Sequence, residues 1–282
     1  MPMITRRRFG ALVGVAAAAA GLPARAETTL ERIRRTGKLT VGTEAAFPPF
    51  EFVKDGEIVG YGKDILVEVV AKMGVELEQL DLPWQGILPG VLAGKFDFVA
   101  TTVGINEERA QRYAYTVPIA NGQPYFAVRK GDTMKTEEDL RGKVVGTQLA
   151  SSTEPIARAV DERLRAEGGA GFRELKLYTA FTDCYVALAN GEIDAVIQSL
   201  PSLASLVSER SDIFDLGGPV ETGTNYTYLA WVTRPDDLDL RDFISEVIIE
   251  MRDDGRLAAL QQKWFGFEMD IPTEGFLPPG AF

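Results

Sequence analysis

The sequence of 282 residues predicts an α/β protein made of two similar lobes. Short apolar segments of strand length alternate with amphipathic segments of helix length, which is typical of a sheet covered by helices. The same order starts again near residue 143, and one motif of the first half returns in the second. No low-complexity or linker-like segment separates the halves of the mature chain, so we expect strands to cross between the lobes, near residues 122–128 and 223–231.

The repeated motif consists of a helix end, a glycine and a short strand. Residues 92–99 read LAGKFDFV and residues 188–196 read LANGEIDAV, with an aspartate at the second position of each strand. Any unrelated helix–glycine–strand unit would show a similar sequence pattern. Two copies in halves of similar order nevertheless favour two α/β lobes over one long sheet.

Residues 1–26 predict an export signal. Three arginines precede Phe9, an apolar run covers residues 10–21, and small residues lead to Ala26. A basic start, a short apolar run and an A-x-A-like end are typical of a secretory signal, and paired arginines before phenylalanine fit the twin-arginine variety. The run is too short for a bilayer span, and no cysteine follows it, so we expect cleavage after Ala26 rather than a membrane or lipid anchor.

Composition excludes several kinds of site. The chain has one cysteine, Cys184, and no histidine. This excludes an internal disulfide, a Cys/His metal site and any catalysis that needs histidine. Without residues 1–26 the chain has 26 basic and 41 acidic residues, a net charge of −15. Such a charge argues against nucleic acid and anionic membrane surfaces as partners.

The first half contains the elements of one lobe. Apolar residues alternate in 38–43, which predicts a strand, and Pro48 and Pro49 require an extended loop after it. A hairpin turn at 54–57 follows. We then expect a helix at 62–73, a strand at 76–82 and a helix at 84–92.

The second half repeats this order. The pattern predicts strands at 123–129, 143–148, 174–178, 193–197 and 226–233, and helices at 154–167, 183–190 and 202–209. The segment 238–264 predicts one or two helices, because Asp253-Asp254-Gly255 interrupts its apolar stripe. Residues 265–282 are rich in proline and glycine, and we expect them to wrap the surface.

Residues 96–109 have the chemistry of a small-anion site. Residues 96–100 predict a buried strand, and the small polar residues after it lead to a helix start with Asn106 as N-cap. Thr102 offers a hydroxyl, the turn offers unpaired backbone N–H groups, and Arg109 offers a guanidinium. Donors and one cation in a single place can hold a small carboxylate.

Nine short motifs carry a family resemblance: LTVGTE (39–44), PFEF (49–52), GYGKDI (60–65), WQGILP (84–89), GKFD (94–97), INEER (105–109), VVGTQ (144–148), LANGEID (188–194), and DG (254–255) with KWFG (263–266). In this order the chain resembles the extracellular solute-binding proteins of family 3, the receptors of polar amino-acid ABC transporters. The resemblance covers nearly all of residues 37–266. It implies the type II periplasmic-binding-protein fold, with two hinge strands and a ligand cleft between lobe 1 (27–123 and 229–282) and lobe 2 (124–228).

The resemblance also implies residues that hold a carboxylate. Arg109 matches the family's carboxylate clamp, and Thr102 and Gly104 lie where the family offers a hydroxyl or backbone bond. Gly104 replaces a common serine, so only its N–H remains. Ser151 and Ser152 match the turn of lobe 2 that donates to the same group. The residue types also allow other roles, since Arg109 can pair with an adjacent glutamate and the serines can cap the next helix.

Further positions concern the body and the far end of the ligand. Phe47 and Trp84 match two aromatic residues that sandwich the ligand, although aromatic side chains most often pack in a core. Glu44 follows the first strand, where relatives for basic ligands can carry an acid; the alternative is a solvated loop acid. Cys184 is expected to be a small buried hydrophobe.

Ser199 departs from the family pattern. The family usually has an aspartate there, which binds the α-ammonium of the ligand, whereas serine supplies no charge. Either Glu44 or Asp183 provides the counter-charge, or the cation of the ligand is placed differently, or the ligand lacks a standard α-ammonium. A cyclic or methylated amino-acid derivative is compatible with this set of residues.

The resemblance predicts a monomeric periplasmic receptor that binds a small zwitterionic or carboxylate ligand and delivers it to an ABC permease in the inner membrane. We expect no cofactor, no metal, no nucleic-acid partner and no direct membrane insertion. The alternative is an enzyme, because a few members with this fold are periplasmic dehydratases that act on cyclohexadienyl substrates. Glu44 is the acid that such a mechanism would recruit.

Overall fold

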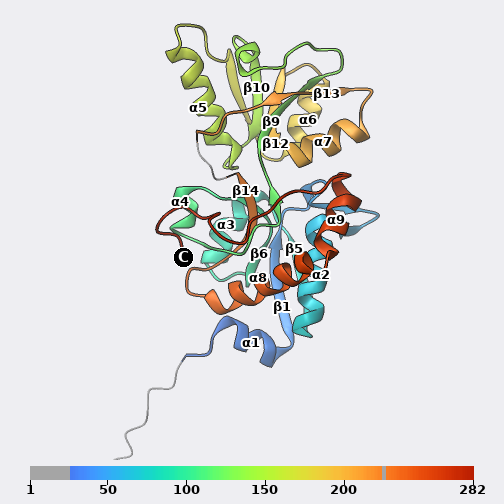
Figure 1. The fold of residues 1–282 in the computed structure, drawn as a ribbon, viewed down its shortest axis with the longest axis vertical. Coiled ribbons are helices and arrows are strands. Elements are labelled where there is room, and N and C mark those ends of the chain that lie inside the picture. The colour runs from blue at the N-terminus through green and yellow to red at the C-terminus, as the bar shows by residue number, and fades with distance from the viewer. Residues whose placement is uncertain (1–25, 224–226) are drawn as a thin grey trace, which may run out of the picture.

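The computed structural model describes residues 26–223 and 227–282. The predicted export signal lies outside the described residues, apart from Ala26. Two separate sheets form the centres of two lobes that are stacked along the long axis of the molecule (Figure 1). The predicted two-lobed α/β fold is confirmed.

The first lobe is built on a six-stranded sheet with the order β5-β1-β6-β14-β7, and β8 pairs with β14 beside this path. In its centre, β1 (Lys38–Thr43), β5 (Glu76–Asp81) and β6 (Phe98–Gly104) are parallel, and β14 (Tyr228–Thr233) is antiparallel to β6. The other elements of this lobe are β2 (Ala46–Phe47), β3 (Glu51–Lys54), β4 (Glu57–Val59), β7 (Ala114–Tyr115), β8 (Ala120–Asn121), α1 (Thr29–Thr36), α2 (Tyr61–Met73), α3 (Trp84–Leu92), α4 (Glu107–Ala110), α8 (Leu238–Asp253) and α9 (Arg256–Phe265).

The second lobe is built on a five-stranded sheet with the order β11-β10-β12-β9-β13. Here β10 (Val144–Gln148), β11 (Glu174–Tyr178) and β12 (Ala195–Ser199) are parallel, and β9 (Pro124–Arg129) is antiparallel to β12. The remaining elements are β13 (Phe214–Pro219), η1 (Glu137–Leu140), α5 (Thr153–Ala166), α6 (Phe181–Ala189) and α7 (Leu200–Glu209). Each lobe therefore has three parallel strands followed by one antiparallel strand.

The repeated sequence motif has the same structural role in both lobes. The backbone N–H of Thr40 donates to the carboxylate of Asp97 at 3.0 Å, and the N–H of Asp97 returns a bond to the Thr40 carbonyl at 2.8 Å. Asp194 makes the same pair of bonds with Val144, at 2.8 Å and 2.7 Å. Each aspartate thus binds the middle one of the three parallel strands of its lobe, β1 or β10.

Glycines at equivalent positions of β1 and β10 leave room for the residue before each aspartate. A Cβ on Gly42 would lie 2.6 Å from the ring of Phe96, and a Cβ on Gly146 would lie 2.5 Å from the side chain of Ile193. Real side chains do not approach so closely, so the ring and the aliphatic chain pack directly over the strand backbone.

The structure corrects the expected limits of the central strand. β6 begins at Phe98 rather than Phe96 and continues to Gly104, so Thr101 and Thr102 belong to the strand and not to a turn. β6 is buried along its whole length and pairs with β14 as far as Gly104 opposite Leu229. Threonine is β-branched and fits a pleated, buried strand, whereas its polarity alone suggests a loop.

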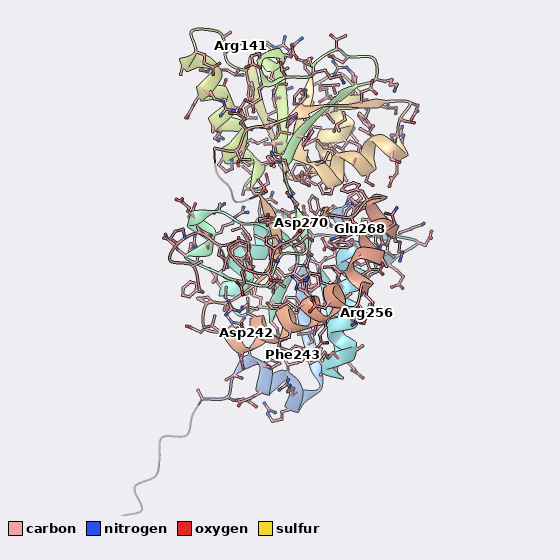
Figure 2. The ribbon with its side chains drawn as sticks, in the orientation of Figure 1. Arg141, Asp242, Phe243, Arg256, Glu268 and Asp270 are labelled. Atoms are coloured by element: carbon pink, nitrogen blue, oxygen red, sulfur yellow. The ribbon has the colours of Figure 1, made fainter. Side chains whose placement is uncertain are left out.

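Contacts between distant elements hold the helices of the first lobe together. The guanidinium carbon of Arg34 on α1 lies 5.3 Å from the ring centre of Phe243 on α8. Arg256, at the start of α9, donates to Asp254 at 2.9 Å and forms an ion pair with Glu68 on α2. Phe243 and Arg256 are labelled in Figure 2. The break between α8 and α9 lies at the predicted position, where Gly255 has a φ of 84°.

The C-terminal segment after α9 packs against the first lobe. Ile271 and Phe276 are each 8% exposed, and Arg241 on α8 donates to the carbonyl of Phe282 at 3.2 Å. Within residues 26–223 and 227–282, no helix is long and apolar enough to cross a membrane.

Candidate functional site

A narrow cavity lies between the lobes, at the carboxyl ends of β1, β6, β10 and β12. Open α/β sheets bind their ligands at this edge. The cavity is small, about 30 Å³, because the lobes touch across it. Every residue that the sequence assigned to a ligand site lies on its wall: Glu44, Phe47, Trp84, Thr102, Gly104, Arg109, Ser151, Ser152 and Ser199.

Arg109 carries the positive charge of the cavity. Asn106 caps α4 by accepting the backbone N–H of Arg109 at 2.8 Å, as predicted, and this fixes the position of the residue. One guanidinium nitrogen donates to the carbonyl of Gly104 at 3.2 Å, and the other donates to the carbonyl of Ala150, in the second lobe, at 2.7 Å. The ring centre of Trp84 lies 5.5 Å from the guanidinium carbon.

No acid neutralises Arg109 among the described residues. Of the two glutamates that precede Arg109, Glu108 pairs with Arg112 at 3.4 Å instead. Burial lowers the pKa of Arg109, but an arginine keeps its charge at any ordinary pH. The guanidinium therefore remains a half-buried cation whose partners are neutral carbonyl oxygens, an arrangement that a carboxylate would improve.

The turn between β10 and α5 is strained where it reaches across the cavity. Ala150 has a φ of 59°, in the left-handed region that a non-glycine residue enters at a cost of about 1 kcal/mol. Its carbonyl accepts from Arg109 and from the indole N–H of Trp84, the latter at 2.9 Å. Its N–H donates to Glu154 at 2.7 Å. Strain of this kind is concentrated at functional sites.

The two serines of this turn do not cap α5 with their side chains. The hydroxyl of Ser151 donates to the carbonyl of Gln148 at 2.7 Å, and Ser152 occupies the N-cap position without a side-chain capping bond. Ser152 faces Gly104 of the first lobe, where an added Cβ would lie 2.3 Å from the Ser152 hydroxyl. The missing side chain of Gly104 therefore allows the lobes to meet here.

Glu44 carries the negative charge of the cavity. It is 6% exposed, so the interpretation as a solvated loop acid is wrong. The amide of Gln148, from the second lobe, donates to one of its carboxyl oxygens at 2.5 Å. Burial raises the pKa of Glu44 to about 7; the bond from Gln148 opposes the rise, and the Asp81 carboxylate adds to it. The Glu44 carboxyl therefore keeps its proton to a higher pH than an exposed glutamate does.

Asp183, the other acid considered as a counter-charge, does not line the cavity. It is exposed and accepts a hydrogen bond from Thr179 at 3.1 Å. Among the described residues, the only charged side chains on the wall are thus those of Glu44 and Arg109.

Several buried polar atoms at this place have no hydrogen-bond partner within the described chain. They include the hydroxyl oxygen of Thr102 on the wall and one carboxyl oxygen of Glu51 behind it. Glu51 is fully buried, its other oxygen accepts from Thr101 at 2.8 Å, and burial raises its pKa well above the ordinary value. Unpaired buried polar groups are costly, so the wall is suited to a ligand or water that satisfies them.

The aromatic residues belong both to the core and to the cavity wall. Phe47 stacks on Phe50 with ring centres 5.2 Å apart and lies 5.8 Å from Phe181 of the second lobe. Phe181 lines the cavity and was not predicted from the sequence. Cys184, one turn further along α6, is fully buried, as expected; burial raises the pKa of its thiol to about 12.

Gln148 and Gln198 on the cavity wall were also not predicted from the sequence. Both lie at the carboxyl ends of central strands, β10 and β12, as Thr102 and Gly104 do in β6. That position is a signal, but only the order of strands in the sheet places these ends at the same cavity. In the described part of the chain, no cluster of three His, Cys, Asp or Glu residues could hold a metal ion.

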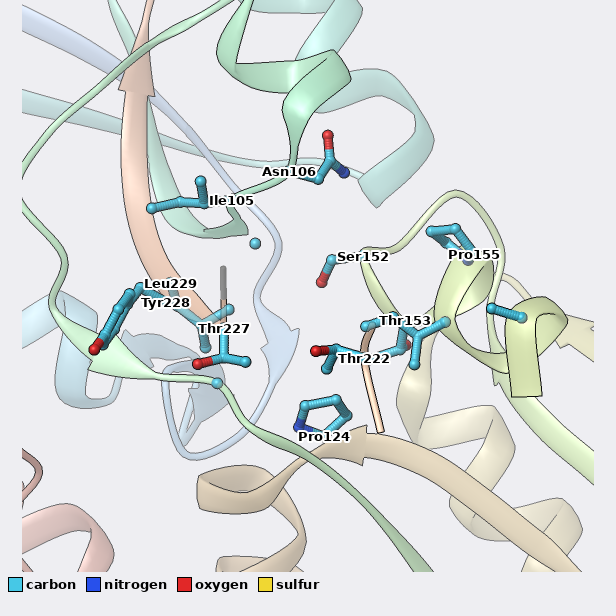
Figure 3. Close-up of a pocket in the computed structure, with 14 residues that line it drawn as sticks. Ile105, Asn106, Pro124, Ser152, Thr153, Pro155, Thr222, Thr227, Tyr228 and Leu229 are labelled. Carbon is cyan, nitrogen blue, oxygen red and sulfur yellow. The ribbon is translucent and has the colours of Figure 1, made fainter. Parts of the chain in front are cut away.

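A second cavity of about 180 Å³ adjoins the first on the side where the chain passes from one lobe to the other (Figure 3). Gly104, Gly122, Ser152 and Leu229 lie on the walls of both cavities. Asn106, Pro124, Thr227 and Tyr228 are among the residues that complete the second wall, and none of its described residues is charged. A charged end of a ligand is therefore better accommodated in the first cavity.

Comparison with known proteins agrees with this geometry. The sequence profile of the bacterial extracellular solute-binding proteins, family 3, matches residues 39–267. The chain belongs to this family. The L-cystine-binding protein TcyJ of Escherichia coli (strain K12) is 29% identical to it over 275 residues, covering 92% of this chain and 96% of TcyJ. The probable histidine-binding protein of Campylobacter jejuni is 23% identical over 227 residues, covering 80% and 84%.

Solved structures show the same fold. A mutant of ArgBP from T. maritima is 30% identical, with a TM-score of 0.72 that covers 84% of this chain and 99% of that one. An ancestral arginine-binding protein bound to arginine is 31% identical, with a TM-score of 0.70 over 82% and 99% of the two chains. The family resemblance predicted from the sequence is thus confirmed.

Proposed function

We propose that this protein is the ligand-binding component of an ABC importer and takes up an amino acid or a related small zwitterion. The main support for the proposal is that Arg109, a cation on the wall of the cavity between the lobes, has no acidic partner among the described residues. Its two nitrogens face carbonyl oxygens, which a ligand carboxylate can replace with stronger, charge-assisted bonds. Thr102 and the turn at Ser151 and Ser152 are the further candidates to bind this carboxylate.

Ligand binding is coupled to closure of the lobes in this proposal. Residues 27–123 with 229–282 form one rigid lobe, residues 124–228 form the other, and the strands between them act as the hinge. The contacts of Arg109 with Ala150 and of Glu44 with Gln148 join opposite lobes. A ligand that replaces these contacts holds the lobes together, and the permease recognises the closed receptor.

The cellular setting follows from the N-terminal segment and from the relatives. We propose export through the twin-arginine route, cleavage after Ala26 and function as a monomer in the periplasm. Relatives are named as binding proteins for L-cystine and histidine, and an ancestral structure of similar fold has arginine bound. These names support an amino-acid-like ligand without fixing its identity.

A binding screen with a pair of arginine variants tests the proposal. Thermal shift and then calorimetry against amino acids, opines and compatible solutes should find a ligand with a micromolar or lower Kd, which corresponds to about −8 kcal/mol or better. Loss of two charge-assisted bonds of about 1.5–3 kcal/mol each should make Arg109→Ala bind at least ~100-fold more weakly. Arg112→Ala, a change one turn away at a side chain paired with Glu108, is the control and should bind normally.

Two results would contradict the proposal. One is a screen in which no compound stabilises the protein. The other is a ligand whose affinity falls equally in the two variants, because the clamp would then not be Arg109.

An enzyme remains a second candidate because Glu44 has the property of a general acid. A carboxyl in a cleft with a pKa of about 7 can both give and take a proton near neutral pH. Incubation with prephenate or arogenate, followed by absorbance, tests this dehydratase function. We expect no turnover, since the relatives are named as binding proteins. Turnover that Glu44→Gln removes would establish the enzyme instead.

A further inference from the structure

The cavity holds two opposite charges, and neither has a charged partner within the described chain. Arg109 is bonded to the carbonyl oxygens of Gly104 and Ala150, and Glu44 is bonded to the amide of Gln148. In each case a neutral group of the second lobe occupies the place of an opposite charge. Buried charges are stable only when they are paired and hydrogen-bonded, so each of them lacks the partner that suits it best.

The two charges lie at different ends of the cavity wall. Arg109 belongs to the end formed by α4, Trp84 and the Ala150 turn, whereas Glu44 follows β1 and contacts the end of β10. Arg109 also borders an open cavity with Trp84 and Ala150, and Glu44 borders another cavity with Asp81 and Ala180. Neither residue lines the other's cavity. A ligand that pairs with both must therefore carry its own charges at some distance from each other.

The rest of the wall offers no negative charge for a second cation. Ser199 is bonded to Ser202 at 3.2 Å, and its backbone N–H donates to the carbonyl oxygen of the Gln198 side chain at 2.7 Å. That bond fixes the orientation of the amide, so the remaining polar group of Gln198 is its nitrogen, a hydrogen-bond donor next to the Tyr185 hydroxyl. A donor repels an ammonium group and favours an acceptor.

We propose that the preferred ligand is a carboxylate with a single cationic group at the far end of its chain and no α-ammonium. This inference rests on the proposed function and specifies the class of its ligand. The carboxylate replaces the Ala150 carbonyl at Arg109, and the distal ammonium, guanidinium or quaternary ammonium group replaces the Gln148 amide at Glu44. Phe47 and Phe181, which approach each other from opposite lobes, enclose the chain between the two ends.

An α-amino acid fits this wall less well. With a neutral side chain it places its cation beside its carboxylate, far from Glu44. With a basic side chain it satisfies both charges but buries a second ammonium next to Gln198 and Ser199, where no acid compensates it. The first case leaves both Glu44 and the α-ammonium without a partner, and the second leaves the α-ammonium.

Calorimetry with three six-carbon compounds of equal length tests the inference. These are 6-aminohexanoate, with only the distal ammonium; norleucine, with only the α-ammonium; and lysine, with both. We expect 6-aminohexanoate to bind at least tenfold more tightly than either of the others, and the shorter ω-amino acids, down to 3-aminopropanoate, to define the best chain length. Glu44→Gln should weaken the best ω-amino acid at least tenfold.

One substitution should reverse the preference. Ser199→Asp supplies an acid where the second ammonium would lie, so lysine should gain at least tenfold in affinity relative to 6-aminohexanoate. If norleucine or lysine binds the unmodified protein more tightly than every ω-amino acid, and Arg109→Ala removes that binding, this inference is wrong while the proposed function stands. If neither these compounds nor any amino acid binds, both are wrong.

Discussion

Replacing Glu44 by glutamine tests the charge state of the cavity. Burial raises the pKa of Glu44 to about 7 from an ordinary value of 4.5. The folded protein therefore binds more protons at Glu44 than the unfolded chain between these values, and this group lowers stability as the pH rises through that range. The gap corresponds to about 3 kcal/mol of unfolding free energy. Glutamine keeps an oxygen that accepts from Gln148 but carries no charge, so the stability of the variant does not decrease with pH for this reason.

Urea denaturation of the ligand-free protein between pH 5 and pH 8 measures the effect. The stability of Glu44→Gln relative to wild type should rise with pH and level off above pH 7, at a gain of about 3 kcal/mol. The control is Glu78→Gln. Glu78 is exposed, and the hydrogen bond from Lys38 lowers its pKa, so its effect should not change in this range. A difference for Glu44→Gln that stays constant with pH would show that Glu44 is hydrated in the native protein.

Other changes test the contacts across the cavity. Gly104→Ala should weaken ligand binding about tenfold or more, because the new methyl group would lie 2.3 Å from the Ser152 hydroxyl and hold the lobes apart. Calorimetry of the double variant should show no further loss of affinity relative to Ser152→Gly alone, and a full additional loss from Gly104→Ala would exclude this cause. Ala150→Gly should leave the melting temperature unchanged or raise it, because it relieves a left-handed φ. Ala159→Gly, at an exposed position inside α5, should lower the unfolding free energy by about 1 kcal/mol, and similar losses in the two variants would contradict the strain. As the pH is lowered below 7, the affinity for a ligand with a distal cation should decrease, by up to about tenfold for each pH unit, because Glu44 must release its proton to bind the cation. An affinity that does not change between pH 5 and pH 8 would contradict this pairing.

Local sequence patterns predicted most elements of the fold because they depend on neighbouring residues. The alternation of apolar and polar residues at 38–43 predicted both ends of β1, and the apolar stripe at 62–73 predicted α2 to within one residue. Elements that depend on distant partners were missed. The helix α1 has a polar sequence and is held by contacts such as that of Thr28 with Asp239, at 2.6 Å. The two-residue strands β7 and β8 exist only because β14 pairs with them.

The wall of the cavity was partly predictable for the same reason. Arg109 and Thr102 could be assigned because the strand, the N-cap and the helix start are close in sequence. Gln148 and Phe181 of the second lobe could not, since their places in the cavity depend on how the lobes meet. The charge of Glu44 also required the structure, because an acid after a strand has the same sequence signal whether it is buried or solvated.

The identity of the molecule that the protein retains is the most direct test of the central claim, that Arg109 and Glu44 together select a small zwitterionic carboxylate. Protein purified under native conditions is denatured, and the released small molecule is identified by mass spectrometry. We expect a carboxylate with one cationic group, lost from Arg109→Ala and retained by the Arg112→Ala control. A retained molecule without a carboxylate, or one that Arg109→Ala still carries, would contradict the assignment of this cavity.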